Sequence, residues 1–438
     1  MEWWLILLFI LISLFALMFM KVPVAFAFIL VNMVTAFIFW NGEEGLKLLV
    51  TSIENSLTTF TLVPIALFIL MGEIMFHSGV APRMLNALDK WLGNIPGRLS
   101  ILSVFGGTML STLTASSMAS TAMLGSTLLP EMEKQNYDRK MAMGPILASG
   151  GLAVMIPPSA LGVLLASLGK ISVGDFLIAI ILPGILMALL FLIYVFIRVK
   201  IHPALAPKYT VSTIPISTKI KETVIYILPL GSIIFLVIGS IFLGLASPTE
   251  AAAMGAIGSF ILAFAYKQMN MEVLVKAVSG TLKLTGMILM IVAASVAFSQ
   301  ILAFTNIARS LVNLVSNLEI APTIILILML LIVLFLGMFM ESLSIMMVTV
   351  PIYIPLAEVL DFNLLWFAVL LLIAIEIGQI TPPFGLGLFV MQGVAPKGTT
   401  MLDIYKSATP YIFLILITLV IVIAFPSVAT WLPDIMER

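Results

Sequence analysis

Long apolar segments recur along the whole chain, and they limit its possible folds more than any motif does. A helical crossing of the roughly 30 Å hydrocarbon core needs about 20 apolar residues, and the sequence supplies enough such runs for about ten crossings. Of its 438 residues 62% are hydrophobic and only 10% are charged, whereas soluble domains have about 25% charged residues. We therefore expect an all-α polytopic membrane protein with about ten transmembrane spans and no separate soluble domain.

The composition also excludes several classes of function. The formal charge is zero and there is no basic tail, so a nucleic-acid partner is not expected. Cysteine is absent, which rules out disulfides and thiolate metal sites. No HExxH motif occurs and neither histidine lies at the centre of a span, so we do not expect an enzyme. A channel would need polar residues along a continuous pore, whereas here the polar residues gather at two proline-containing breaks and in two hairpin segments.

Loop charges set the expected orientation. The first positive charge, Lys21, follows the first apolar run, so the positive-inside rule places the N-terminus outside. The same rule makes the basic stretch 198–221 cytoplasmic. The count of crossings agrees with both only if segment 99–130 enters the membrane and leaves on the same side, as a re-entrant hairpin.

A single spacing of 225 residues relates the two halves of the chain. It links "PPSALG", which begins at Pro157, to "PPFGLG", which begins at Pro382, and Ser117 to Ser342. Five crossings in each half would place the halves upside down relative to each other, and such inverted repeats are typical of secondary transporters. The expected domains are a first repeat 1–205 with surface arm 81–98, hairpin 99–130 and broken helix 141–168, a cytoplasmic linker 206–221, and a second repeat 222–438 with hairpin 322–355 and broken helix 363–394.

The paired prolines predict a break in a helix of each half. Proline has no amide hydrogen, so Pro157 and Pro158 should free the carbonyls of Ala153 and Val154. Pro382 and Pro383 should likewise free Gly378 and Gln379. Free carbonyls at membrane depth are tolerated only where protein, water or an ion replaces the lost donor. Each break is therefore a candidate cation site, and a plain proline kink is the alternative.

Polar side chains in the two hairpins offer further ligands. Hydroxyl and carbonyl oxygens suit hard cations, although small residues can also serve only to let helices pack closely. The residues concerned are Thr114, Ser116, Ser117 and Ser120 in the first hairpin, and Glu341, Ser342 and Ser344 in the second.

Several motifs together resemble the large membrane subunit of TRAP transporters, the DctM-type family. They are "MGEIMFHSGV", "SPTEAAAMGA", "GMFMESLSIMMVTVPIYIP", "EIGQITPPFGLGLFVMQGV" and the segment 128–176. The resemblance implies a sodium-driven importer of small organic acids, carboxylates or sulfonates, in the bacterial inner membrane, with a periplasmic N-terminus. It also implies a small four-helix membrane subunit, a periplasmic substrate-binding protein and an elevator mechanism. Because this sequence starts at "MEWWL", we expect the small subunit to be a separate chain.

By matching motif, the resemblance implies about two Na⁺ sites and one substrate site. Where family members often have aspartate in the second hairpin, this chain has Glu341. The first Na⁺ site would use Thr114, Ser117, Ser120, Gly150, Ala153, Val154 and Pro157. The second would use Glu341, Ser342, Gly378, Gln379 and Pro382. Substrate would lie near Ser116, Ser159, Ser344 and Thr381.

Two points stay open at the level of sequence. Glu376 is the deepest carboxyl in an apolar segment, and it could carry a proton or seal a broken helix through hydrogen bonds. A stand-alone sodium-coupled dicarboxylate or citrate symporter with a similar inverted-repeat fold is the alternative function.

Overall fold

A computed structural model describes residues 2–114, 116–207, 214–317 and 319–436. Within these ranges the chain is entirely helical and has no strand. The helices of the first half are α1 (Trp3–Phe19), α2 (Val24–Phe39), α3 (Glu43–Leu57), η1 (Phe60–Leu62), α4 (Val63–His77), α5 (Val80–Leu92), α6 (Arg98–Thr114), α7 (Ser117–Lys134), α8 (Arg139–Met155), α9 (Ala160–Leu168), α10 (Val173–Ala179), α11 (Ile181–Ile201) and η2 (Pro203–Leu205). Those of the second half are α12 (Ile216–Glu222), η3 (Thr223–Ile227), α13 (Leu228–Phe242), α14 (Pro248–Ala265), α15 (Met271–Phe304), α16 (Ile307–Ser316), α17 (Pro322–Gly337), α18 (Ser342–Val359), α19 (Leu364–Gln379), α20 (Leu386–Val394), α21 (Met401–Ala424) and α22 (Ser427–Met436).

The helical membrane protein predicted from the apolar runs is confirmed. Seven helical segments of the described chain are long and apolar enough to cross a membrane, or eight if α8 and α9 are one bent span. Five shorter apolar helices, including α1, α2 and α19, add to these. A count of ten crossings requires some of the shorter helices to cross as well. Residues 43–77 form three consecutive helices, α3, η1 and α4.

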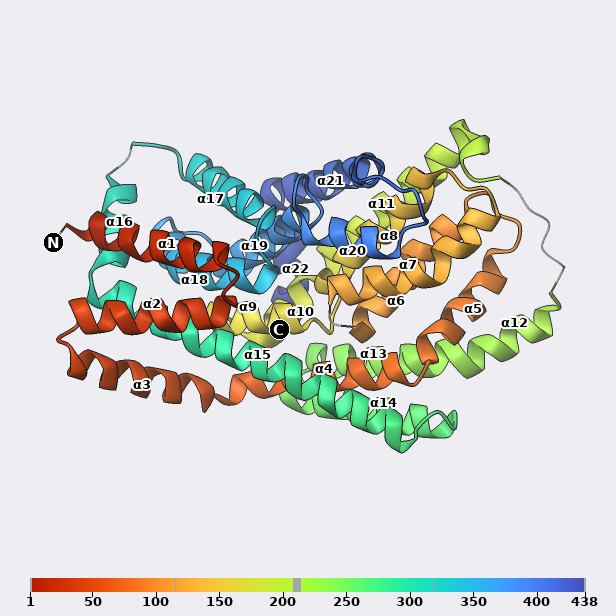
Figure 1. Cartoon of the computed structure of the whole chain (residues 1–438). Helices are drawn as coiled ribbons and strands as arrows, with labels where there is room; N and C mark the ends of the chain where they lie inside the picture. The colour runs from red at the N-terminus through yellow and green to blue at the C-terminus, as the bar shows by residue number, and fades with distance from the viewer. Residues whose placement is uncertain (1, 115, 208–213, 318, 437–438) are drawn as a thin grey trace.

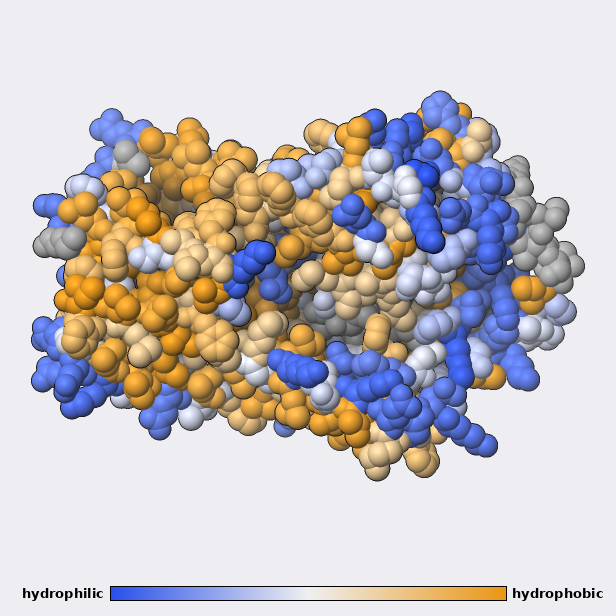
Figure 2. Space-filling view, in the orientation of Figure 1, coloured by the Kyte–Doolittle hydropathy of each residue, from blue (hydrophilic) through white to orange (hydrophobic). Residues whose placement is uncertain are grey.

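The surface of the molecule has the apolar character that lipid contact requires. Apolar side chains cover the part of one face formed by α1, α2 and α17, whereas polar side chains gather at the opposite end around α5 (Figures 1 and 2). On α1, Ile12 is 58% exposed and Phe19 is 85% exposed. In water so many exposed large apolar side chains would promote association. Next to lipid chains their exposure carries no hydrophobic penalty.

Two helical hairpins lie in corresponding parts of the chain. The first pairs α6 with α7, and the second pairs α17 with α18 across the tip 338–341. The predicted ends of both hairpins, at 130 and 355, are wrong, because α7 continues to Lys134 and α18 to Val359 with prolines inside the helix. Helices in membranes tolerate internal proline where neighbouring groups satisfy the freed carbonyls.

Two broken helices form the centre of the molecule. Helices α8 and α9 are bent by 48° across residues 156–159, and α19 and α20 are separated by residues 380–385. All residues of α8 from Met141 to Met155 are buried, as are all residues of α19 from Trp366 to Gln379. The Pro157–Pro158 and Pro382–Pro383 peptide bonds are both cis.

Helix α5 covers most of segment 81–98, which is predicted to be a surface arm, and it ends at Leu92. It is tied to the start of the second half, because Lys90 forms an ion pair with Glu222 and the Trp91 indole N–H donates to Thr223 Oγ1 at 2.7 Å. At the linker 206–221, residues 208–213 lie outside the described ranges and α12 begins at Ile216.

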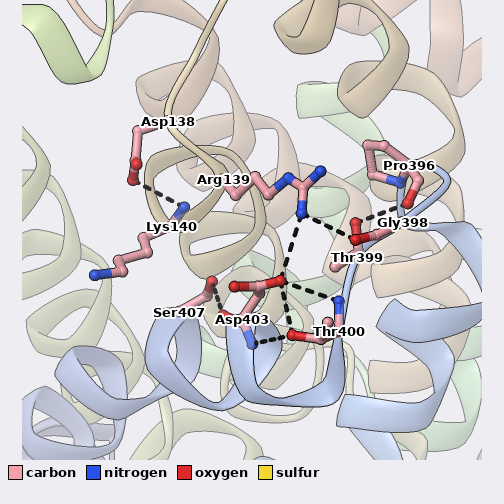
Figure 3. A network of polar contacts seen from close by, with 9 residues as sticks. All are labelled: Asp138, Arg139, Lys140, Pro396, Gly398, Thr399, Thr400, Asp403 and Ser407. Atoms are coloured by element: carbon pink, nitrogen blue, oxygen red, sulfur yellow. Dashed lines mark hydrogen bonds and ion pairs between the residues drawn. The ribbon is translucent and has the colours of Figure 1, made fainter.

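A polar network joins the start of α8 to the loop after α20 (Figure 3). Asp138 caps α8 by accepting a hydrogen bond from the Lys140 N–H at 3.0 Å. Arg139 Nη1 donates to the Gly398 carbonyl at 3.1 Å and lies 3.4 Å from Asp403 Oδ2. Thr400 and Asp403 form a reciprocal cap at the start of α21. The first broken helix is thereby connected to the segment that follows the second.

Candidate functional site

The first break is largely enclosed by protein, and Ile156 is the one residue of 156–159 that is partly exposed. Pro157, Pro158 and Ser159 are all buried. The Ile156 N–H donates to the Leu152 carbonyl at 3.0 Å, and no backbone N–H in the described ranges donates to the carbonyls of Ala153 or Val154. These two oxygens are free in the way that the prolines predict, because neither proline has an N–H to offer.

Ser159 has a structural partner at the start of α9. Its Oγ accepts a hydrogen bond from the Gly162 N–H at 3.0 Å, and the residue is only 1% exposed. This is an N-cap, which satisfies one of the amide groups that the first turn of a helix leaves without a partner. The hydroxyl keeps its own proton for a further acceptor, and its assignment to substrate stays a prediction.

The second break is arranged differently. The expectation that the Gly378 carbonyl is left free is wrong, because the Thr381 N–H donates to it at 3.1 Å. Thr381 Oγ1 in turn donates to the Ile377 carbonyl at 2.6 Å, and Tyr405 Oη donates to the Pro383 carbonyl at 2.7 Å. Pro382 is half-buried and Pro383 is exposed. Donors near the break thus satisfy some of the carbonyl oxygens that the prolines leave without a backbone N–H.

Gly385 lets the second break turn back on itself. A Cβ at this position would lie 2.6 Å from the Gln379 carbonyl oxygen and 2.8 Å from the Thr381 carbonyl oxygen. The Gln379 oxygen also lies close to Gly387, 3.1 Å from where its Cβ would be. Only residues without a Cβ allow these carbonyls to approach the first turn of α20 so closely.

The tip of the first hairpin carries hydroxyl groups on one helix face. Ser116 caps α7 by accepting from the Ala119 N–H at 3.3 Å. Ser117, Ser120 and Thr121 follow at positions that share one side of the helix. The Ser120 hydroxyl is fully buried and has no hydrogen-bond partner in the described part of the chain. The side chain of Thr114 and residue 115 lie outside the described residues.

This hydroxyl face packs against α8 at Gly150. A Cβ on Gly150 would lie 2.1 Å from Thr121 Oγ1, 2.9 Å from the Ser117 carbonyl oxygen and 3.4 Å from Ser117 Oγ. The structure therefore brings two predicted ligands of the first Na⁺ site together, namely Ser117 and Gly150, and Ser120 lies on the same face of α7 as Ser117. Thr121 belongs to the same cluster and was missed, although its spacing from Ser117 was visible in the sequence.

The tip of the second hairpin is attached to the second broken helix. The Gln379 side-chain amide donates to the Met340 carbonyl at 3.0 Å, and the backbones of Gly337 and Gly378 touch. Glu341 precedes α18 without capping it and is half-buried. Ser342 and Ser344 are 7% and 1% exposed. The predicted ligands of the second Na⁺ site thus lie on two segments in direct contact.

Glu376 does not seal α19 through hydrogen bonds, which was one of its two expected roles. It is 1% exposed, and neither carboxylate oxygen has a hydrogen-bond partner among the described residues. The Ser117 hydroxyl on α7 lies near this carboxyl. Its neighbour on α8 is Gly151, whose Cβ would lie 3.3 Å from Oε2. Glu376 therefore joins the cluster around the first Na⁺ site.

The oxygens present fit a monovalent cation better than a divalent or transition metal. Across the described ranges, no group of three or more His, Cys, Asp or Glu residues is placed to hold a metal ion. Ca²⁺ and transition metals usually take several carboxylate, imidazole or thiolate ligands. Each break instead offers hydroxyl groups, free carbonyls and at most one carboxylate.

A polar cavity that sequence reasoning missed lies beyond the end of α9. It has a volume of about 360 Å³ and is lined by hydroxyl and amide side chains of α3 and α15, among them Asn55, Ser299 and Gln300. Lys170 contributes the one cationic side chain of its lining. A cavity of this size and chemistry can admit a small anion.

Comparisons with known proteins agree with this architecture. The family model described as "Tripartite ATP-independent periplasmic transporter, DctM component" matches residues 11–428. The C4-dicarboxylate TRAP transporter large permease protein DctM of Pseudomonas aeruginosa is 31% identical over 90% of this chain and 91% of its own length. Its namesake from Vibrio cholerae is 31% identical over 96% of this chain and 95% of its own length.

The fold also has a solved counterpart. The YdaH transporter of Alcanivorax borkumensis superposes with a TM-score of 0.66 at 16% identity, over 87% of this chain and 90% of that one. This likeness bears on the fold alone. The sequence relatives are transport permeases and not enzymes. With the family model matched over nearly all of its length, the chain belongs to the DctM family, the large permease components of tripartite ATP-independent periplasmic transporters.

Proposed function

We propose that the chain is a sodium-coupled importer of small organic acids in the bacterial inner membrane. The observation that carries the proposal is the first break, where no backbone N–H of the described residues donates to the carbonyls of Ala153 or Val154, and where Gly150 of the same helix packs against the hydroxyl face of α7. Carbonyl oxygens released by a discontinuous helix are a recurring way to coordinate Na⁺ in secondary transporters. A second Na⁺ would bind where Glu341 and Ser342 meet Gln379 and Pro382.

The substrate is a small carboxylate or sulfonate. Two relatives are named for C4-dicarboxylates, which favours a compact acid of this kind. Ser116, Ser159 and Ser344 would donate hydrogen bonds to it between the hairpin tips. Thr381, whose hydroxyl donates to the Ile377 carbonyl, would have to turn away from that carbonyl to join them. Lys170 in the polar cavity supplies a counter-charge for a carboxylate that approaches along α9.

The family name implies three components. We propose that a periplasmic binding protein delivers the acid and that a small four-helix membrane subunit, a separate chain, supports this one. In an elevator mechanism the two hairpins and the two broken helices would move together. Helices α4, α14 and α15, which pack on one another, would belong to the stationary part.

Uptake into liposomes tests the proposal. The chain would be reconstituted with the small subunit and given the binding protein loaded with radiolabelled succinate, under an inward gradient of Na⁺ or of K⁺. We expect uptake only with the Na⁺ gradient and only with both partners present. Equal uptake under K⁺ would contradict sodium coupling, and uptake by this chain alone would favour a stand-alone symporter.

The orientation can be tested separately. The chain has no cysteine, so Ser217→Cys on the exposed side of α12 would introduce a single thiol. If the linker is cytoplasmic and the N-terminus periplasmic, membrane-impermeant maleimide should label this thiol only after the cells are lysed. Labelling in intact cells would reverse the topology.

A further inference from the structure

Glu376 is a buried acid that the proposed function does not use. It lies in the last turn of α19, is 1% exposed, and both of its carboxylate oxygens lack a hydrogen-bond partner in the described part of the chain. An ionised carboxylate in such a place is strongly unfavourable unless a positive charge or several donors compensate for the lost water. The carboxyl is therefore either protonated or given a compensating positive charge in the working protein.

No basic side chain supplies it. The ion pairs of the described chain join other residues, and none of them includes Glu376. The polar group that faces the carboxylate is the hydroxyl of Ser117. The compensating positive charge, whether a proton or a bound cation, therefore comes from outside the polypeptide.

The carboxylate projects toward the place where α8 has no side chain. Its Oε2 lies 3.3 Å from where a Cβ on Gly151 would be. Gly151 and Glu376 are separated by the same 225 residues that relate the two proline pairs. The acid of the second broken helix thus meets a glycine at the equivalent position of the first, and the adjacent Gly150 lets α7 approach the same point.

Oxygen atoms approach this point from two helices, and α8 leaves room for them with its glycines. Helix α7 contributes the hydroxyls of Ser117, Ser120 and Thr121, and that of Ser120 is buried without a partner. Helix α19 contributes the carboxylate. One negative charge with several neutral oxygens is the ligand set of a monovalent cation, whereas Ca²⁺ usually takes several carboxylates.

We propose that Glu376 is the anionic ligand of a Na⁺ ion held between α7, α8 and α19. The inference rests on the proposed sodium coupling and deepens it, since the ion would join the first hairpin to the second broken helix. The bound ion neutralises the carboxylate, so the cluster carries no net charge through the membrane interior. An unoccupied cluster must bind a proton or keep an uncompensated charge, and the uncompensated charge penalises movement of the empty transporter.

Sodium-dependent thermal stabilisation of the purified full-length chain tests this assignment. The midpoint of unfolding is measured as NaCl replaces choline chloride at constant ionic strength, for the wild type, Glu376→Gln and the control Glu358→Gln. Glu358 is an exposed acid near the end of α18. Losing a charged ligand should weaken the apparent Na⁺ affinity by about 10- to 100-fold in Glu376→Gln, and Glu358→Gln should match the wild type.

The outcomes separate the two proposals. A wild type whose stability ignores Na⁺ would overturn sodium coupling together with this inference. A Glu376→Gln protein with wild-type Na⁺ affinity would overturn the assignment of Glu376 alone and leave sodium coupling in place. If Glu376→Gln does not fold, Ser120→Ala keeps the charge and removes one hydroxyl ligand. It should weaken Na⁺ several-fold, and unchanged affinity there would count against the site.

Discussion

The two broken helices share a sequence motif but differ in how the carbonyl oxygens freed by their prolines are satisfied. At "PPSALG" the two prolines are buried, Ser159 caps the next helix, and no backbone donor within the described ranges reaches the carbonyls of Ala153 and Val154. At "PPFGLG" the break is partly exposed, and Thr381 and Tyr405 donate to two of the carbonyls around it. Phe384 stands where Ser159 stands in the first half, and it packs against Phe339 of the hairpin tip at 5.5 Å between ring centroids.

The difference shows that paired prolines decide where a helix breaks but not what happens to the freed oxygens. In the first half those oxygens stay available beside the α7 hydroxyls and Glu376, which suits an enclosed ion. In the second half much of the hydrogen bonding is restored locally, and Gln379 fastens the hairpin to the break. We infer that an ion at the first break is the more tightly enclosed of the two.

Gly385→Ala should have the largest effect on uptake, because the backbone turn at the second break leaves no room for a Cβ. The added Cβ would lie within 3.0 Å of two backbone carbonyl oxygens, which cannot rotate away as a side chain could. Overpacking of this kind costs about 1–3 kcal/mol or more, enough to reduce succinate uptake by more than about tenfold. Uptake is measured in the three-component liposomes.

The matched control is in the other half. Position 160 corresponds to 385 and already carries alanine, so Ala160→Gly tests the same exchange in reverse. It should retain most of the uptake. Normal uptake by Gly385→Ala would show that the second turn is no tighter than the first.

Replacing each proline pair with Ala-Ala should separate the two breaks. At Pro157–Pro158 the new N–H groups can bond Ala153 and Val154, so the apparent Na⁺ affinity should fall by about tenfold or more, as expected when an ion loses carbonyl ligands. At Pro382–Pro383 the Gly378 carbonyl already has a donor, and a loss of about threefold or less is expected. The measurement is the Na⁺ dependence of uptake. A greater loss at the second pair would reverse the comparison.

Much of the fold could be predicted from the sequence because its causes are local. Apolar runs of membrane length predict helices, and adjacent prolines predict breaks, since both depend on a few consecutive residues. Helix ends were less predictable. Pro130 and Pro355 do not end their helices, because neighbouring helices can satisfy the carbonyls that a proline frees.

The residues of the candidate site could be predicted from the sequence, but the contacts between them could not. Ser117, Ser120 and Gly150 follow from motif positions, but contact between Glu376 and Gly151 depends on how two segments 225 residues apart cross. The donor that Thr381 offers to Gly378 depends on the exact backbone turn after the break. Such details come from tertiary packing, which residue types alone do not determine.

Ser159→Ala should have a moderate effect that is specific to the capped break. Loss of an N-cap hydroxyl typically costs about 1 kcal/mol, so thermal unfolding without substrate should begin at a lower temperature. Ser159→Gly is the matched control, since glycine at an N-cap costs only a few tenths of a kcal/mol relative to serine. If alanine and glycine are equally stable, the cap does not explain why the first break is closed.

The smallest effect is expected where the two broken helices are joined at the surface. Arg139 is half-exposed, and its ion pair with Asp403 connects α8 to the segment after α20. Exposed ion pairs contribute little because water and salt screen them, so Arg139→Gln should shift the unfolding midpoint by less than about 2 °C. Uptake should stay within about twofold of the wild type. A much larger loss of uptake with unchanged stability would mean that this contact couples the two broken helices during transport. Uptake would then depend more on the connection at the surface than on the differences between the two breaks.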